Sequence, residues 1–268
     1  MLVKRKSIRG EHEKVRYIQG LVSLHNVQLN VYCFEVDGLL VDTGAQVLLN
    51  EFKPFFAEAD VEQVVITHFH EDHTGGAAYL QREYQLPIYQ NEMTIGDCAK
   101  KADYPLYRKI FWGNRKPYEA IPIGETFTSR TATWDVIPTP GHAKDHLAFI
   151  NRETGQLFSG DLYVTPKTKL ALREESIPSI IQSIEKVLTY DFAELFCCHA
   201  GFIKDGRKVL TNKLHYLKEL QGKIVTLQKE GLNEFEIQAK LFKKKYPLTL
   251  FSSGEWDSIH IIRSILQD

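Results

Sequence analysis

The sequence predicts a fold that mixes β-sheet with α-helix and ends in a helical carboxy-terminal extension. Short β-branched and apolar runs separated by turn residues dominate the first part of the chain. One of these runs, residues 62–67, leads into a cluster of histidines and then into a helical pattern. Such strand–loop–helix units are where α/β proteins usually place their sites. Beyond residue 208 the apolar residues follow helical spacing, with Gly and Pro breaks.

Local signals place the individual elements. Asp37-Gly38 favours a tight hairpin turn, and Pro54 is expected near an end of its helix or at a kink. Ser176 is the expected N-cap of a helix that has Pro178 in its first turn. We expect strands at 15–24, 29–36, 39–44, 62–67, 133–140, 147–161 (a hairpin turning at Thr154-Gly155) and 193–199, and helices at 46–59, 75–84, 176–190, 208–231, 233–246 and 256–266.

Length and composition fit one large domain with a full core. The chain has 268 residues, of which 43% are hydrophobic, enough to bury a sizeable core. We expect this domain to span residues 1–207 and the helical extension, residues 208–268, to pack on it. The net charge of −1 provides no global positive field for nucleic acid or an anionic membrane.

The predicted location is the cytoplasm. The first fifteen residues are charged and lack the apolar segment of a secretion signal, and no run approaches the roughly 18 apolar residues of a membrane span. No disulfide framework or thiolate metal site is expected from the cysteines, two of which are adjacent and none of which form a CxxC pair. They are Cys33, Cys98, Cys197 and Cys198.

The histidine cluster predicts a metal site. His68, His70, Asp72 and His73 fall within six residues and precede two glycines that let the chain turn into a helix. In an extended segment the first three share one side, and a turn at Asp72–His73 would redirect the last imidazole. Imidazole and carboxylate suit Zn²⁺, Fe²⁺ or Mn²⁺. A solvated polar loop is the alternative, but the pattern arises by chance with a probability on the order of 10⁻³.

Further ligands are expected, because a single loop supplies too few ligands to complete the coordination of two metals. The candidates are His142, Asp161 and His199, each of which follows an apolar strand and lies within two residues of a glycine. A single His or Asp beside Gly is usually a turn residue. Their order after the histidine cluster makes them stronger candidates together than singly.

These motifs identify a resemblance to the metallo-β-lactamase-fold metallohydrolases. The matching segments are "LLVDTG" (39–44), "THFHEDHTGG" (67–76), "TPGH" (139–142), "SGD" (159–161) and "CHAG" (198–201), in the family's order over about residues 15–205. The resemblance implies an α+β fold, an αββα sandwich of two face-to-face mixed β-sheets with helices outside and a binuclear centre at one edge.

The resemblance also implies a role for each matching residue. Asp161 would bridge the two metals, and Asp42 would support the ligands, its alternative being a turn-forming aspartate. The first metal would be held by His68, His70 and His142, and the second by Asp72, His73 and His199.

Departures within the superfamily narrow the expected chemistry. Asp161 replaces the cysteine ligand of the most studied zinc β-lactamases, and His70 stands where flavodiiron relatives have glutamate. The ligand set most resembles that of glyoxalase II-type thioesterases, acyl-homoserine-type lactonases and phosphodiesterases. The expected function is a cytoplasmic binuclear hydrolase whose metal-bridging hydroxide attacks an ester, thioester or lactone carbonyl. Asp72 is the candidate for proton transfer.

Three other functions stay open. They are a phosphodiesterase or nucleic-acid-processing hydrolase, a non-catalytic metal-binding or sensing module, and a mononuclear iron redox enzyme. The sequence shows no stripe of basic residues interleaved with aromatic residues, and this weakens the nucleic-acid alternative. We expect two divalent ions, zinc first with iron or manganese as alternatives, a small-molecule substrate, no nucleic-acid or membrane partner, and room for a homodimer interface.

Several other side chains have two interpretations. His146 is expected to be a structural or ligand-supporting histidine rather than a ligand. Tyr163 could donate to a substrate oxyanion or simply pack. Lys167, Lys169 and Arg173 could pair with an anionic substrate or form a solvated loop. The carboxy-terminal helices would form a wall of the substrate pocket.

Overall fold

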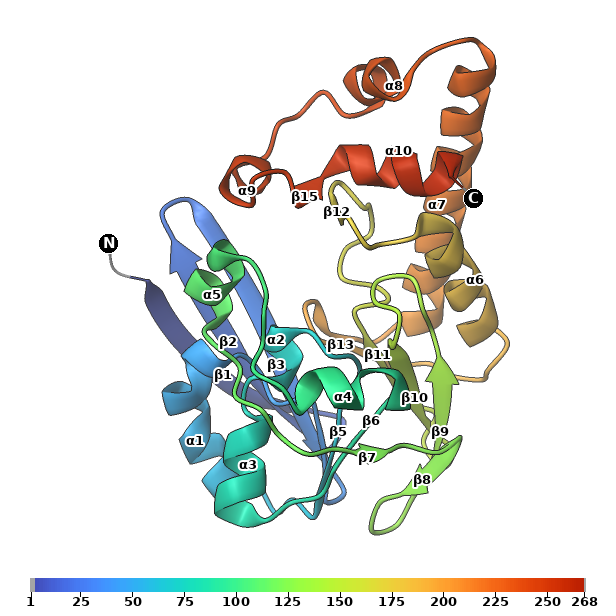
Figure 1. Ribbon diagram of the computed structural model, residues 1–268. Helices are drawn as coiled ribbons and strands as arrows, with labels where there is room; N and C mark the ends of the chain where they lie inside the picture. Colours follow the sequence, from blue (N-terminus) through green and yellow to red (C-terminus); the bar gives the residue numbers. More distant parts are fainter. Residues whose placement is uncertain (1–2, 268) are drawn as a thin grey trace.

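Two β-sheets lie face to face in the computed structural model, which describes residues 3–267 (Figure 1). The strands of the seven-stranded sheet follow one another in chain order. Neighbours are antiparallel from β1 to β4 and parallel from β4 to β7. The strands are β1 (Lys4–His12), β2 (Val15–Leu24), β3 (Val27–Val36), β4 (Leu39–Val41), β5 (Gln63–Val65), β6 (Ile88–Gln90) and β7 (Ile121–Pro122).

The six-stranded sheet has the order β14-β13-β11-β10-β9-β8. Its β11 and β13 run parallel, and the other neighbours are antiparallel. The strands are β8 (Thr126–Thr128), β9 (Thr133–Pro138), β10 (Leu147–Asn151), β11 (Leu157–Gly160), β13 (Leu195–Cys197) and β14 (Gly201–Ile203). A separate antiparallel pair joins β12 (Ala171–Leu172) to β15 (Trp256–Asp257).

The two sheets share an aromatic core. Phe34 of β3 lies edge-on to Phe158 of β11 and to Phe196 of β13, with ring centroids 5.6 Å away in both cases. Trp134 and Phe149 of the second sheet are also fully buried in this layer. Edge-to-face aromatic contacts add to the free energy gained from burying the rings. This layer therefore fixes the distance between the strand ends that carry the candidate ligands.

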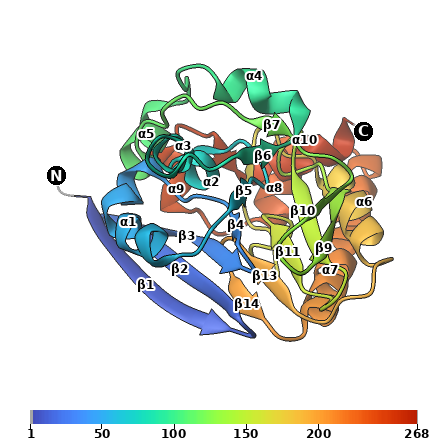
Figure 2. The same cartoon turned by 90° about the horizontal axis from the view of Figure 1, so that it is seen from below.

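Helices cover the outer face of each sheet. Phe52, Phe55 and Phe56 of α1 pack on the first sheet, whereas Ile184 of α6 and Leu217 of α7 pack on the second. Figure 2 shows α1 and α3 on one side of the sheets and α6 and α7 on the other. The predicted αββα sandwich is confirmed. The helices are η1 (Gln46–Leu48), α1 (Leu49–Glu58), α2 (Glu71–Thr74), α3 (Ala77–Tyr84), η2 (Glu92–Thr94), α4 (Ile95–Cys98), α5 (Leu106–Trp112), α6 (Ile177–Val187), α7 (Gly206–Lys229), α8 (Glu234–Leu241), α9 (Pro247–Phe251) and α10 (Ser258–Leu266).

Near the amino terminus, two features differ from the sequence expectations. The charged segment Lys4–His12 forms β1, whose side chains are mostly exposed, so it lacks the alternating apolar pattern of a half-buried strand. Pro54 lies inside α1 rather than near an end. It is on the exposed face of that helix, where water can bond the carbonyl group that a proline leaves free.

The carboxy-terminal helices share a core with the second sheet. Leu210, Leu214 and Leu217 of α7 belong to the same buried cluster as Ile137 and Leu195 of that sheet. In Figure 1, α9, β15 and α10 (red) lie above α5 and β12. The predicted helical extension is therefore present, and the domain boundary after residue 207 stays a prediction.

Asp145 connects loops of the two halves of the molecule. Its buried carboxyl group leads us to expect that the stability of the fold depends on pH. Its Oδ2 accepts a hydrogen bond of 2.6 Å from Thr94 Oγ1, and burial raises its pKa to about 6. Because the folded-state pKa exceeds the unfolded value, the protonated acid stabilises the fold below about pH 4, and this contribution is lost as the pH rises through about 6. The loss corresponds to about 3 kcal/mol.

Asp145→Asn should abolish this component. Urea unfolding of both proteins from pH 4 to pH 7 should show the variant gaining stability relative to the natural protein as the pH rises. The difference cancels titrations common to both proteins. Parallel stability curves would show that Asp145 ionises in the fold as readily as in the unfolded chain.

Candidate metal centre

His68, His70 and His142 direct three ring nitrogens at one point. The first two follow β5, and His142 follows β9. His70 Nδ1 lies 3.1 Å from His68 Nε2 and 3.1 Å from His142 Nε2. Donor atoms around one ion with metal–nitrogen bonds of about 2.0–2.1 Å have similar separations. The pKa values of His68 and His70 are lowered, chiefly by burial, which favours the neutral imidazoles that metals bind.

Asp72, His73, Asp161 and His199 form an adjoining second group. His199 Nε2 lies 2.9 Å from Asp161 Oδ2 and 3.5 Å from Asp72 Oδ2. His73 Nε2 lies 3.6 Å from Asp161 Oδ2. The same oxygen of Asp161 is 3.4 Å from His142 Nε2 of the first group. The structure thus brings all seven sequence-predicted donors together, with the Asp161 carboxylate between the two groups.

Unpartnered donor atoms fit a bound cation at this place. Among the described residues, His73 Nε2 and Asp161 Oδ1 are buried and have no hydrogen-bond partner, an arrangement that costs free energy unless a ligand satisfies them. Burial alone would raise the pKa of Asp161, but His199 and His73 outweigh it and hold the pKa well below its usual value. A carboxylate that stays ionised beside imidazoles suits Zn²⁺, Fe²⁺ or Mn²⁺.

The expected turn at Asp72–His73 is present, but as part of a helix, so Asp72 does not lie on the extended segment expected from sequence. His70 caps α2, so Asp72 and His73 lie on a helical turn rather than on an extended chain. Gly75 and Gly76 are needed for close packing, because a Cβ would lie 2.1 Å from Gln46 N at the first and 2.5 Å from Thr43 O at the second. The two glycines therefore allow the histidine cluster to pack closely against the loop that follows β4.

Asp42 supports the cluster through the second nitrogen of His73. Its Oδ2 lies 2.8 Å from His73 Nδ1 and accepts a hydrogen bond of 2.8 Å from Thr67 Oγ1. The Cys198 thiol donates to the same oxygen over 3.0 Å. Partners of this kind fix the orientation of a ligating imidazole. The contacts match the supporting role expected for Asp42.

Two carboxylates that sequence reasoning missed support the first group. Glu174 Oε1 lies 3.0 Å from His70 Nε2, and Glu175 Oε1 lies 3.2 Å from His142 Nδ1. Each contacts the nitrogen that faces away from the other imidazoles. The segment 171–175 has no metal-ligand spacing, and the basic residues Lys167, Lys169 and Arg173 around it suggested a solvated loop. The segment is held by the pairing of β12 with β15 and by the backbone hydrogen bond of 2.8 Å from Ser176 N–H to the carbonyl of Gly141.

His146 also has a supporting position. Its Nε2 accepts a hydrogen bond of 2.9 Å from the backbone N–H of Asp161, and its Nδ1 lies 2.8 Å from Thr139 Oγ1. Burial lowers its pKa to about 3, so the ring is neutral and can accept. Tyr163 is buried in the core of the second half, which fits packing rather than contact with substrate.

A cavity of about 350 Å³, which we call the inner cavity, adjoins the donors. Lys167 and Lys169 line it, whereas Arg173 does not. Carboxy-terminal residues form part of its wall, in line with the expected role of those helices. Its lining includes the donors His70, Asp72, His142, Asp161 and His199 and the apolar residues Leu29, Phe111, Trp112, Ile180, Leu248 and Trp256.

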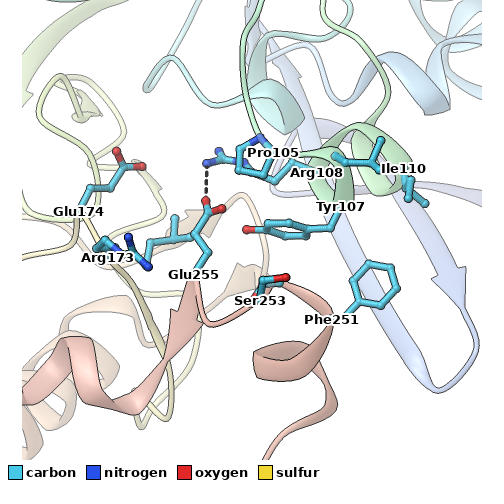
Figure 3. Close-up of a pocket in the computed structure, with 12 residues that line it drawn as sticks. Pro105, Tyr107, Arg108, Ile110, Arg173, Glu174, Phe251, Ser253 and Glu255 are labelled. Carbon is cyan, nitrogen blue, oxygen red and sulfur yellow. Dashed lines mark hydrogen bonds and ion pairs between the residues drawn. The ribbon is translucent and has the colours of Figure 1, made fainter.

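An outer cavity of about 800 Å³ shares Tyr107, Arg108 and Leu172 with the inner one. Arg108 Nε and Nη2 donate to the two Glu71 oxygens over 2.6 and 2.7 Å, and Nη1 donates to Glu255 over 3.2 Å. Figure 3 shows this last contact, with Tyr107 next to it. Arg108 therefore ties α5 to both the histidine loop and the carboxy-terminal segment.

Comparisons with known proteins agree with this architecture. Residues 28–199 match the family model of the metallo-beta-lactamase superfamily. An "Atrochrysone carboxyl ACP thioesterase" of Aspergillus fumigatus is 32% identical over 73% of this chain and 42% of its own length. A "Beta-lactamase-like protein 2 homolog" of Caenorhabditis elegans is 23% identical over 72% of this chain and 62% of its own. The chain spans less than half the length of the thioesterases it matches.

Solved structures share the fold at low sequence identity. A metallo-beta-lactamase from Pontibacter korlensis has a TM-score of 0.63 at 20% identity, covering 80% of this chain and 99% of that one. A beta-lactamase domain protein from Burkholderia ambifaria has a TM-score of 0.68 at 16% identity, covering 97% and 87%. Among the residues of the present structure, no helix is long and apolar enough to cross a membrane. From the match to the family model, this chain belongs to the metallo-β-lactamase superfamily.

Proposed function

We propose that this chain is a metal-dependent hydrolase with a binuclear centre that cleaves a thioester, an ester or a lactone. One observation carries the proposal: seven buried or nearly buried His and Asp side chains converge beside a largely apolar cavity. Perturbed titratable groups that meet in a pocket mark active sites more often than structural ones. The family membership supports the same conclusion.

The donors would divide between two ions, in line with the two groups. Two bound divalent cations would supply a water that is ionised near neutral pH and an electrophile for the carbonyl oxygen. Asp161 would contact both ions, since its Oδ2 lies close to His142, His73 and His199. The first ion would be held by His68, His70 and His142, and the second by Asp72, His73 and His199.

The chain's own residues would orient the substrate and move the proton. Asp72 lines the inner cavity, and its carboxylate is the candidate to accept the proton of the attacking water and to pass it to the leaving group. Glu174, Glu175 and Asp42 hold three imidazoles in orientation through hydrogen bonds of 2.8 to 3.2 Å. Apolar walls exclude competing water from the reacting carbonyl.

A thioester is the first substrate class to test. The inner cavity presents mainly apolar and aromatic walls, which fit an acyl group better than a polyanionic backbone. Several relatives carry the name thioesterase. We propose zinc as the resident metal, with iron or manganese as alternatives that use the same donors. We also propose a cytoplasmic location, since all four cysteines are buried and unpaired.

A hydrolysis panel on the metal-replete protein tests the proposal. It compares an acyl-glutathione thioester, an acyl-homoserine lactone and a bis-aryl phosphodiester under identical conditions, with Asp161→Ala as the inactive control. We expect turnover of the thioester or the lactone that the control lacks. Turnover of the phosphodiester alone would replace the proposed reaction class. No turnover at all, with two metals bound, would favour a non-catalytic metal-binding module.

A further inference from the structure

Lys213 is a buried cation in the wall of the inner cavity. It lies on α7, and the residue is only 5% exposed. It lines the same cavity as Asp161 and His199. Lysine is rarely buried without a partner, because removing the ammonium from water costs several kcal/mol.

Among the described residues, the ammonium of Lys213 interacts with Tyr163 alone, whose ring centroid lies 5.7 Å from Nζ. It donates a hydrogen bond to the backbone carbonyl of Tyr163 and takes part in none of the ion pairs of the described chain. An ammonium has three N–H donors, so this bond leaves two unused. Burial lowers the pKa of Lys213 to about 8, and most molecules therefore still carry the charge at neutral pH.

The other charges around the inner cavity are already matched or exposed. Arg108 is paired with Glu71 and Glu255, and Glu175 contacts His142. Asp72 and Asp161 face the candidate metal ligands. Lys167 and Lys169 are exposed. Lys213 is thus the buried cation of this wall whose charge no carboxylate contacts in the described chain.

We propose that Lys213 binds a carboxylate on the acyl part of the substrate, so that the enzyme selects acyl groups that combine an apolar body with their own acid group. This inference rests on the proposed hydrolase function and narrows its substrate class. An anion in the cavity would satisfy the unused N–H donors with charge-assisted hydrogen bonds. The apolar walls formed by Trp112, Leu248 and Trp256 would contact the body of the acyl group. Lys213 is a specificity-determining residue in this account.

A matched pair of substrates separates this role from a structural one. S-phenyl thioesters of pentanoic acid and of glutaric acid share their chain length and differ in one terminal carboxylate. We expect the metal-replete protein to prefer the glutaryl thioester by at least about tenfold in kcat/KM. Lys213→Gln keeps an N–H donor for the Tyr163 carbonyl and removes the charge, and it should bring the ratio close to one. Lys213→Arg keeps the charge and should retain a preference above one.

The control is Lys208→Gln, which changes an exposed lysine on the same helix and should leave the ratio unchanged. If Lys213 only supports the Tyr163 loop, Lys213→Gln will slow both thioesters by the same factor, and the ratio will stay at the natural value. That result would overturn the proposal. A natural protein without any preference for the glutaryl thioester would overturn it as well.

A binding measurement keeps the inference separate from the proposed reaction. Benzoate titrated into the metal-replete proteins, followed by tryptophan fluorescence, reports on a cavity lined by Trp112 and Trp256. Any benzoate held by the metals binds the natural protein and Lys213→Gln alike. We expect at least about tenfold weaker binding by Lys213→Gln and none of this loss in Lys208→Gln. Equal affinities would refute the anion site, whereas a tenfold loss without any hydrolysis would refute the proposed function alone.

Discussion

Asp161→Ala is expected to abolish hydrolysis and to lower the number of metal ions bound per chain. The Oδ2 atom of Asp161 lies 2.9 Å from His199 Nε2 and 3.4 Å from His142 Nε2, so it touches both donor groups. Removing a residue that only supports a ligand typically costs about 10–100-fold in affinity or activity. Loss of the shared ligand itself should therefore exceed about a hundredfold in kcat/KM.

Kinetics and elemental analysis of the same preparations measure this effect. Asp103→Ala, at a fully exposed aspartate, is the matched control and should keep the natural metal content and activity. An Asp161→Ala protein that binds the natural number of ions and hydrolyses substrate at the natural rate would remove Asp161 from the centre.

Arg108→Met is expected to destabilise the fold by about 3–5 kcal/mol. Glu71 is only 3% exposed, and Arg108 forms its bidentate partner. Burial is the largest influence on Glu71 and raises its pKa, which the ion pair only partly offsets. Without the guanidinium, the fold would bury an uncompensated carboxylate or hold it protonated. Either outcome lowers the free energy of unfolding.

Urea unfolding of the natural and variant proteins gives this value. Arg82→Met breaks an exposed ion pair with Glu83 and should cost less than about 1 kcal/mol. Similar stabilities for the two variants would mean that the Arg108–Glu71 pair contributes no more than a surface pair. A selective loss by Arg108→Met would show that the buried pair contributes more to stability than a surface pair does.

Which candidate donors converge could be predicted from the sequence because their pattern is local. His68, His70, Asp72 and His73 lie in a single loop, and His142, Asp161 and His199 each follow an apolar strand. Strand ends of packed sheets meet at one edge, so the spacing of short motifs was enough to predict which residues converge. The αββα arrangement followed from the same motifs through their resemblance to a family.

The supporting residues could not be predicted because their roles arise from long-range packing. Glu174 and Glu175 follow β12, which pairs with β15 more than eighty residues later in the chain, and Glu174 contacts His70, 104 residues before it. Lys213 lies on a helix whose amphipathic pattern does not reveal what each face covers, and Arg108 lies on α5, a helix of seven residues that was not predicted from the sequence. The one-turn helix α2 was missed for a similar reason, since four residues are too few for a periodic signal.

The most direct test of the binuclear centre is the metal content of the natural protein. Protein purified without chelator, reconstituted with zinc and freed of excess metal, is analysed by inductively coupled plasma mass spectrometry against an accurate protein concentration. The account predicts close to two ions per chain. One ion per chain would contradict the binuclear centre, and none would contradict metal binding by these residues altogether.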